Sequence, residues 1–180
     1  MIDITRNRRS KTKIAEVEFK TLVKNSMLQL SKLENAHRLE VTVVTEGQYP
    51  FYHDTAQLQA IFDNIISNSI KYQHPHELRP KLEITVEVTE SKALMAFKDN
   101  GIGIPASELG KVFDMFYRVP GTKAEGSGLG LYIVKEITRK LKGRIYAESA
   151  TGDGSKFVIE LPNKIDPDLV RKLSRLIQKF

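Results

Sequence analysis

Three polar side chains that could together hold a metal-bound phosphate recur along one predicted helix. Asn64, Asn68 and Lys71 are separated by four and three residues, so they lie on one stripe of a helix, apart from its apolar stripe. An asparagine offers a neutral oxygen that Mg²⁺ accepts alongside phosphate oxygens, and a lysine offers a positive charge. A polar solvent face is the alternative, and this cluster taken alone favours that alternative.

A second cluster begins with a carboxylate at the end of a predicted strand. Asp99 is followed by Gly101, Gly103 and Ile104. A carboxylate can accept a hydrogen bond from the exocyclic amine of adenine, whereas the carbonyl of guanine would oppose it. Glycines allow the backbone to approach a base closely. Because Asp-Asn-Gly is also a common turn sequence, this cluster taken alone is better explained as a turn.

Two more clusters follow along the chain. Residues 112–118 combine aromatic side chains, which could anchor a loop, with Arg118, which could neutralise a γ-phosphate; an ordinary amphipathic turn is the alternative. A glycine-rich stretch then leads directly into a predicted helix. Backbone N–H groups at a helix N-terminus bind phosphate. The residues of this stretch are Gly126, Gly128, Leu129 and Gly130. Its context fits neither a dinucleotide fingerprint nor a P-loop.

The elements that must position these clusters alternate between helices and paired strands. Residues 81–89 alternate apolar and polar side chains, as a half-buried antiparallel strand does, and Asp54 can cap a helix. The pattern predicts helices over 17–36, 54–72 and 130–141, and strands over 39–45, 49–52, 81–89, 93–99, 143–149 and 154–161. This order predicts an α+β two-layer sandwich, with helices on one face of a mixed, mainly antiparallel sheet. Residues 100–127 form a long irregular stretch, which is typical of a functional lid.

The composition restricts the class of protein. The 180 residues are 41% hydrophobic and 28% charged, as expected for one globular domain. The absence of cysteine excludes a disulfide scaffold and a cysteine-ligated zinc. No apolar run approaches the length of a membrane span, so we expect a cytoplasmic location, with a parent protein that could be membrane-anchored. The net charge of +6 comes without a basic and aromatic stripe, so we do not expect nucleic-acid binding.

Taken in order, the four clusters resemble the N, G1, F and G2 boxes of the ATP-binding catalytic domain of bacterial sensor histidine kinases. That domain has the Bergerat fold, shared with gyrase, the MutL repair proteins and the heat-shock chaperone ATPases. The resemblance covers roughly residues 14–162 and implies ATP and Mg²⁺ as ligands. Nucleotide contacts are implied for Asn64, Asn68, Lys71, Tyr72, Asp99, Gly101, Gly103, Ile104, Arg118, Gly126, Gly128, Leu129 and Gly130. Among them, Asn68 resembles the Mg²⁺ ligand.

Asn64 and Arg118 are the candidate catalytic residues. In gyrase-like ATPases a glutamate that activates water occupies the position of Asn64, and an amide is not a useful general base. The resemblance therefore implies transfer of the γ-phosphate to a histidine rather than hydrolysis. A nucleotide-gated interaction module without phosphotransfer and a gyrase-like ATPase remain the alternatives. Ser69 stands where the family usually has alanine.

The phosphate-accepting histidine of the family is not recognisable in this sequence. His37, His53, His74 and His76 lack the surrounding motif. We therefore expect the acceptor on the dimerisation helices of a parent kinase, with a response regulator receiver domain downstream. Residues 1–13 are predicted to be a linker or the tail of the missing dimerisation helix, and residues 163–180 an amphipathic helix. Without the dimerisation helices, we expect a monomer.

Overall fold

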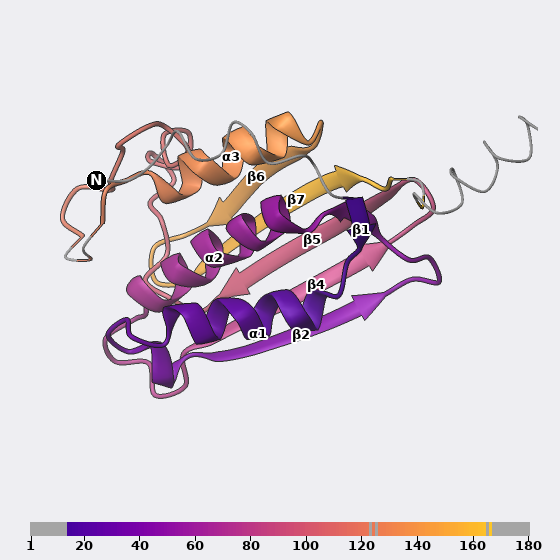
Figure 1. Cartoon of the computed structure of the whole chain (residues 1–180). Helices are drawn as coiled ribbons and strands as arrows, with labels where there is room; N and C mark the ends of the chain where they lie inside the picture. Colours follow the sequence, from indigo (N-terminus) through magenta and orange to yellow (C-terminus); the bar gives the residue numbers. More distant parts are fainter. Residues whose placement is uncertain (1–13, 123, 125, 165, 167–180) are drawn as a thin grey trace, which may run out of the picture.

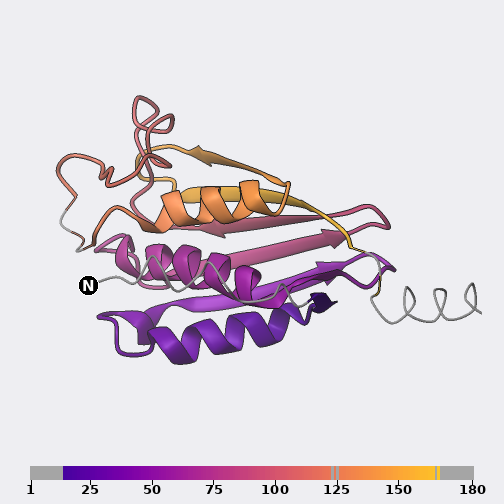
Figure 2. The same cartoon turned by 45° about the horizontal axis from the view of Figure 1, so that its top comes forward.

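The molecule is a two-layer sandwich of helices on a sheet, as Figures 1 and 2 show. The computed structural model describes residues 14–122, 124, 126–164 and 166. Its elements, in chain order, are β1 (Ile14–Glu16), α1 (Phe19–Leu30), the 3-10 turn η2 (Ala36–Arg38), β2 (Glu40–Glu46), β3 (Tyr52–Asp54), α2 (Thr55–Lys71), β4 (Lys81–Val88), β5 (Lys92–Asp99), α3 (Gly130–Lys140), β6 (Arg144–Ser149) and β7 (Ser155–Pro162). The predicted fold class is confirmed.

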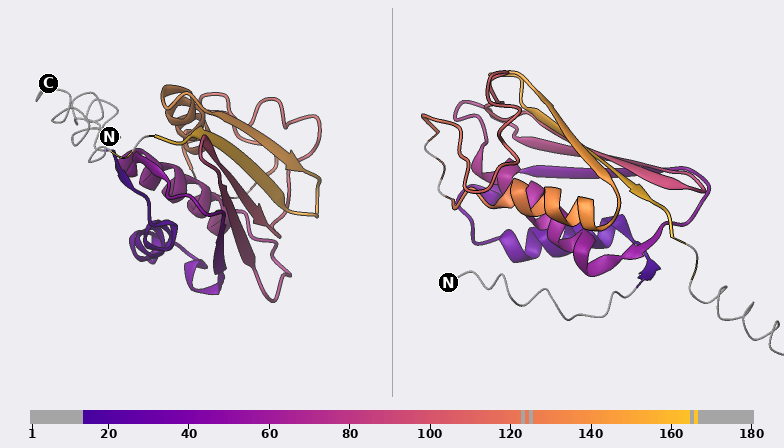
Figure 3. Two further views of the ribbon diagram at one scale, coloured as in Figure 1. Left: turned by 90° about the vertical axis from the view of Figure 1, so that its right-hand side faces the viewer. Right: turned by 90° about the horizontal axis from the view of Figure 1, so that it is seen from above.

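The main sheet has five strands in the order β2-β4-β5-β7-β6. Only β2 and β4 pair in parallel, and the other neighbours are antiparallel. In β4 every second side chain is buried, which is the alternation predicted from the sequence. The sheet therefore has one face that the helices cover and one face that they leave open, as the views in Figure 3 show.

The core lies between α1, α2, α3 and the covered face of the sheet. Helix α2 contributes its central apolar stripe, including Leu58, Phe62 and Ile65, each fully buried. Phe62 meets Phe97 of β5 edge to face, with ring centroids 5.0 Å apart. Asp54 caps α2 by accepting hydrogen bonds from the N–H groups of Ala56 and Gln57, each at 3.1 Å. This confirms the cap predicted from the sequence and fixes where α2 begins.

Two predictions at the N-terminal end were wrong. The first helix ends at Leu30 rather than near Ala36, because the chain turns after Ser31 and Asn35 adopts a left-handed conformation with φ 63°. The short strand predicted over 49–52 lies at Tyr52–Asp54, where it pairs with the unpredicted strand β1. Both strands have three residues, too few to show a periodic pattern.

The predicted lid, residues 100–127, lies at the end of the sheet where α3 begins (Figure 1). Its described residues contain turns and no helix or strand. The predicted linker 1–13 and most of the predicted helix 163–180 lie outside the described residues. Within the described residues, no helix is long and apolar enough to cross a membrane.

Candidate functional site

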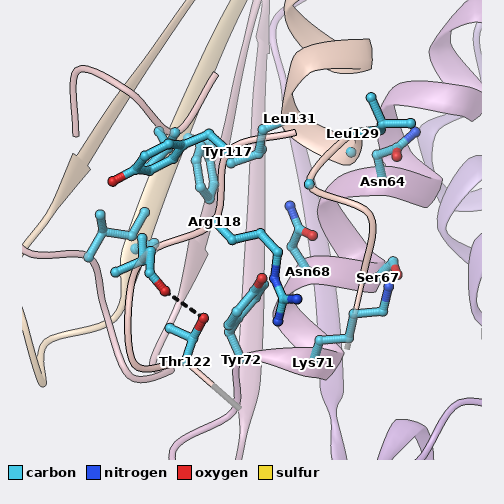
Figure 4. A pocket seen from close by; sticks show the side chains of 18 of the residues that line it. Asn64, Ser67, Asn68, Lys71, Tyr72, Tyr117, Arg118, Thr122, Leu129 and Leu131 are labelled. Carbon is cyan, nitrogen blue, oxygen red and sulfur yellow. Dashed lines mark hydrogen bonds between the residues drawn. The ribbon is translucent and has the colours of Figure 1, made fainter. Parts of the chain in front are cut away.

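One pocket lies between the C-terminal half of α2, the end of β5, the lid and the start of α3. All residues predicted for the site line it except Gly101. Figure 4 shows Asn64, Asn68 and Lys71 along α2, with Arg118 reaching into the same space from the lid. The structure thus brings together clusters that are widely separated in the sequence. Their roles in ligand binding stay predictions.

The wall formed by α2 is polar because its apolar stripe faces the sheet. Asn64 donates from Nδ2 to the Ala60 carbonyl at 2.7 Å. A Cβ atom at Gly130 would lie 3.2 Å from Asn64 Oδ1 and 3.6 Å from Asn68 Oδ1. The missing side chain at Gly130 therefore lets α3 start close beside both amides.

The carboxylate of Asp99 is held by the backbone around it. Its Oδ1 accepts hydrogen bonds from the N–H groups of Gly101 at 2.9 Å and Ser155 at 3.1 Å. Burial raises the pKa of the Asp99 carboxyl above its ordinary value, and hydrogen bonds with Gly101, Ser155 and Ser69 oppose that rise. The group is thus oriented, partly desolvated and placed in the pocket wall.

The glycines after Asp99 are required because the backbone there packs directly against backbone from other parts of the chain. A Cβ at Gly101 would lie 2.4 Å from the Tyr72 carbonyl oxygen. Gly103 has φ +71°, and a Cβ there would lie 2.0 Å from the Ala150 carbonyl oxygen. Gly101 is buried and does not line the pocket, so its position is explained by contact with the end of α2.

Aromatic side chains and a charged cluster hold the first half of the lid. Phe113 meets Phe157 of β7 edge to face at 6.3 Å between ring centroids, which fits the predicted anchoring of the lid to the core. The Tyr117 hydroxyl donates to the Glu108 carboxylate, and Lys111 Nζ lies 3.7 Å from the same carboxylate. Phe116 is 62% exposed and has φ 63°, so this aromatic ring points away from the core.

The glycine-rich stretch joins the lid to α3. A Cβ at Gly128 would lie 2.6 Å from the Phe116 carbonyl carbon and 2.8 Å from the Tyr117 carbonyl oxygen. The backbone at Gly128, just after the lid, therefore packs against the backbone of Phe116 and Tyr117 within it. Among the described residues no side chain caps the N-terminus of α3, whose first N–H groups have no partner within the helix. That end of α3 offers a binding place for an anion.

The charges of the pocket suit a polyphosphate. Lys71 and Arg118 are the cationic side chains that line it within the described residues, and Arg118 donates to the Ala124 carbonyl. In the same part of the chain, no group of three or more His, Cys, Asp or Glu side chains could hold a metal ion. A cation in this pocket would need oxygen ligands from the bound molecule in addition to an asparagine amide.

Sequence reasoning missed several residues of the pocket. Ser155 is the most important, because its N–H group helps to hold Asp99. It reaches Asp99 because β7 pairs with β5, with Lys156 opposite Lys98. This pairing joins strands that are distant in the sequence, and no local signal predicts it. Ser67, Tyr117 and Thr122 also line the pocket.

Comparisons with known proteins agree with the fold. Residues 53–165 match the family described as histidine kinase-, DNA gyrase B- and HSP90-like ATPase. The sensor protein kinase WalK of Staphylococcus epidermidis is 39% identical over 118 residues, which are 64% of this chain and 19% of that protein. The chain therefore spans about a fifth of the length of this relative.

Solved structures share the fold at lower identity. The mycobacterial sensor histidine kinase MprB superposes with a TM-score of 0.69 at 23% identity, covering 87% of this chain and all of that one. Full-length ShkA in complex with AMPPNP superposes with a TM-score of 0.68 at 19% identity, covering 88% of this chain and 33% of that one. The family match extends over more than half of the chain, so this protein belongs to the histidine kinase-, DNA gyrase B- and HSP90-like ATPases and is homologous to the catalytic domains of sensor histidine kinases.

Proposed function

We propose that this domain binds Mg·ATP in the pocket and presents the γ-phosphate to a histidine on a separate domain of a parent sensor kinase. The observation that carries the proposal is the convergence of Asn64, Asn68, Lys71, Asp99 and Arg118 on one pocket. The relative WalK is a sensor protein kinase, and ShkA, with the same fold, is in complex with AMPPNP. The first supports phosphotransfer, and the second supports an adenine nucleotide as the ligand.

The adenine ring would bind at the Asp99 end of the pocket. The hydrogen bonds from Gly101 and Ser155 orient the carboxylate, and an ionised carboxylate only accepts hydrogen bonds. It would therefore select the exocyclic amine of adenine and oppose the carbonyl of guanine or hypoxanthine. Tyr72 and Ile104 supply part of the surrounding wall.

The phosphates would lie between α2, the lid and the start of α3. The N–H groups at the start of α3, which no side chain of the described residues caps, would supply positive potential there together with Lys71 and Arg118. Asn68 is the candidate protein ligand for Mg²⁺, with phosphate oxygens completing the coordination. Bound Mg²⁺ would neutralise charge that develops on the phosphates during transfer.

Asn64 favours phosphotransfer over hydrolysis. Its Nδ2 is bonded to the Ala60 carbonyl, and an amide does not take a proton from water. An imidazole nitrogen needs no such activation, because its own lone pair attacks the γ-phosphorus. The new N–P bond forms while the bond to the bridging oxygen breaks, and ADP leaves with the electron pair. The acceptor would belong to the dimerisation helices of the parent, and a response regulator receiver domain would then take the phosphoryl group.

Titration of the 180-residue chain with ATP and GTP in the presence of Mg²⁺ tests the nucleotide site. We expect selective binding of ATP, and loss of that selectivity in Asp99→Asn, because an amide can rotate to offer a donor. Gly110→Ala is the control, since a Cβ at this lid position has open space around it. If neither nucleotide binds, the proposal is wrong.

Adding dimerisation helices that carry the acceptor histidine tests the transfer step. We expect radiolabel from γ-labelled ATP to appear on those helices, in an acid-labile form typical of phosphohistidine. The second candidate is a nucleotide-gated interaction module, which the exposed lid side chains Met115 and Phe116 favour. Nucleotide binding without any label transfer would support this second candidate.

A further inference from the structure

The turn between β6 and β7, residues 150–154, lies against the segment that carries Asp99. Gly152 donates from its N–H group to the Ile102 carbonyl at 2.8 Å. A Cβ at Gly154 would lie 2.0 Å from the Asp99 carbonyl oxygen, so the backbone at Gly154 packs directly against the backbone at Asp99. The contact at Gly103 described above repeats this arrangement on the other side of the turn. The turn therefore packs closely against the 99–104 segment, with a hydrogen bond at Gly152 and close backbone contacts at Gly103 and Gly154.

A single hydroxyl joins these two segments. Ser149, the last residue of β6, accepts a hydrogen bond at Oγ from the Ile104 N–H group at 2.8 Å. The same hydroxyl donates to the Gly154 carbonyl at 2.6 Å and lies 3.2 Å from Ser155 Oγ. A serine hydroxyl has one hydrogen to donate and two lone pairs, so Ser149 can donate to Gly154 while it accepts from Ile104.

The peptide group between Gly154 and Ser155 transmits this contact to Asp99. The Gly154 carbonyl and the Ser155 N–H group belong to one planar unit. Ser149 holds the carbonyl side of that plane, and the N–H side donates to Asp99 Oδ1 at 3.1 Å. If the plane rotated away from Ser149, the N–H group would turn away from Asp99 as well.

We propose that Ser149 is a positioning residue for adenine recognition, acting on Asp99 through the Gly154–Ser155 peptide and on the start of the lid through Ile104. This inference rests on the proposed function, because it assigns a further residue to the same nucleotide site. Ser149 does not line the pocket, so its influence on a bound base is indirect.

The test compares ATP with inosine triphosphate in variants of the full 180-residue chain. Inosine triphosphate has the same phosphates but carries a carbonyl oxygen in place of the adenine amine, so the ratio of the two dissociation constants reports on Asp99. We expect Ser149→Ala to weaken ATP binding about fivefold to tenfold, the effect of leaving partly buried backbone groups without partners. Binding of inosine triphosphate should change much less. Ser149→Thr keeps the hydroxyl and should restore the ratio.

Thr89→Val is the matched control. Thr89 joins β4 to β5 at the opposite end of the sheet, where its hydroxyl donates to the Lys92 carbonyl and accepts from the Lys92 N–H group. Its loss should lower the unfolding midpoint without changing the nucleotide ratio. A purely structural Ser149 would behave in the same way, so the ratio separates positioning from simple stabilisation.

Hydrogen exchange in the absence of nucleotide gives a second readout. We expect faster exchange at the Ser155 and Ile104 amides in Ser149→Ala than in the unchanged chain and in Thr89→Val. Unchanged exchange at Ser155 together with an unchanged nucleotide ratio would overturn the inference. If the unchanged chain does not distinguish ATP from inosine triphosphate, the proposed function has failed, and exchange at Ser155 then decides whether Ser149 positions Asp99. If Ser149→Ala does not fold, Ser149→Cys, with a weaker donor, provides the same comparison.

Discussion

The two ends of α2 use polar residues in opposite ways. At its N-terminal end, three polar residues bond to backbone groups within the chain. Asp54 caps the helix, His53 Nδ1 accepts from the Asp54 N–H group at 2.9 Å, and Asn163 bonds to Tyr52, Pro50 and Thr89. At its C-terminal end, Asn64, Asn68 and Lys71 line an open pocket instead.

The difference shows how one helix serves both the fold and the site. The apolar stripe along its middle is fully buried against the sheet, so its position is fixed by packing. The N-terminal cap fixes where the helix starts, and the C-terminal polar stripe is left to face a ligand. This comparison predicts that changes at the N-terminal end alter stability, and that changes at the pocket end alter nucleotide binding as well.

Of the single substitutions, Gly103→Ala should have the largest effect. Alanine would need the left-handed conformation at φ +71° and would bring a Cβ to 2.0 Å from a backbone oxygen of Ala150. We expect loss of ATP binding and a fall of about 2 kcal/mol or more in the free energy of unfolding. ATP titration and urea unfolding measure the two effects.

Gly110→Ala in the same lid provides the control. Apart from its neighbours in the chain, no described residue comes within 4 Å of the position that a Cβ would take there. This variant should leave both quantities close to those of the unchanged chain. If Gly103→Ala bound ATP normally, the contact between the 99–104 segment and the β6–β7 turn would not matter to the site.

Much of α2 and the sheet could be predicted from the sequence, because their signals are local. The alternation of residues 81–89 predicted the buried face of β4, and Asp54 predicted the start of α2. The stripe of Asn64, Asn68 and Lys71 predicted one wall of the pocket. Periodicity and capping depend on neighbours within one or two turns, so the sequence displays them directly.

The remaining features depend on contacts between distant parts of the chain. Strand β1 exists because it pairs with β3, with Ala15 opposite His53. Ser155 and Ser149 act on Asp99 and Ile104 only because β7 lies between β5 and β6. A three-residue strand and a serine at the end of a strand carry no local signal for these contacts.

The pH dependence of stability should report on His53 at the N-terminal end of α2. Burial and the charge of Lys164 lower the pKa of His53 from 6.5 to about 4, and Asp54 opposes this. Between these values the unfolded chain binds a proton that the folded chain does not. The contribution of His53 to the free energy of unfolding is therefore fully present above pH 6.5. It is lost as the pH falls toward 4, by about 3 kcal/mol in total.

Urea unfolding of the unchanged chain and of His53→Asn across this range measures the effect. Asparagine can accept the hydrogen bond from the Asp54 N–H group without titrating, so the variant should lose less stability on acidification. Its affinity for ATP at neutral pH should match that of the unchanged chain. If the free energy of unfolding falls equally with pH in the two proteins, His53 does not cause the loss of stability in acid.

The pH dependence of ATP binding should report on Asp99, which lies in the pocket that the C-terminal half of α2 lines. Because burial raises the pKa of this carboxyl above 3.8, protonation should weaken ATP binding at a higher pH than an ordinary aspartate would. Below that pKa the affinity should fall about tenfold per pH unit. The ratio of ATP affinity to inosine triphosphate affinity removes the titration of the phosphates, because both nucleotides carry the same phosphates. In Asp99→Asn this ratio should not change with pH. A flat ratio in the unchanged chain would exclude Asp99 as the acceptor.

Asp54→Ala should have the smallest effect and tests whether the two ends of α2 are independent. Removing the cap leaves the Ala56 and Gln57 N–H groups without their acceptor, which should lower the free energy of unfolding by about 1 kcal/mol. Asp54→Asn keeps an acceptor oxygen and should lose less. Asn64 lies ten residues along the helix, about 15 Å away, and the buried middle of α2 separates it from the cap. ATP affinity should therefore stay unchanged in both variants; a parallel loss of affinity and stability would mean that the cap also sets the position of the pocket wall.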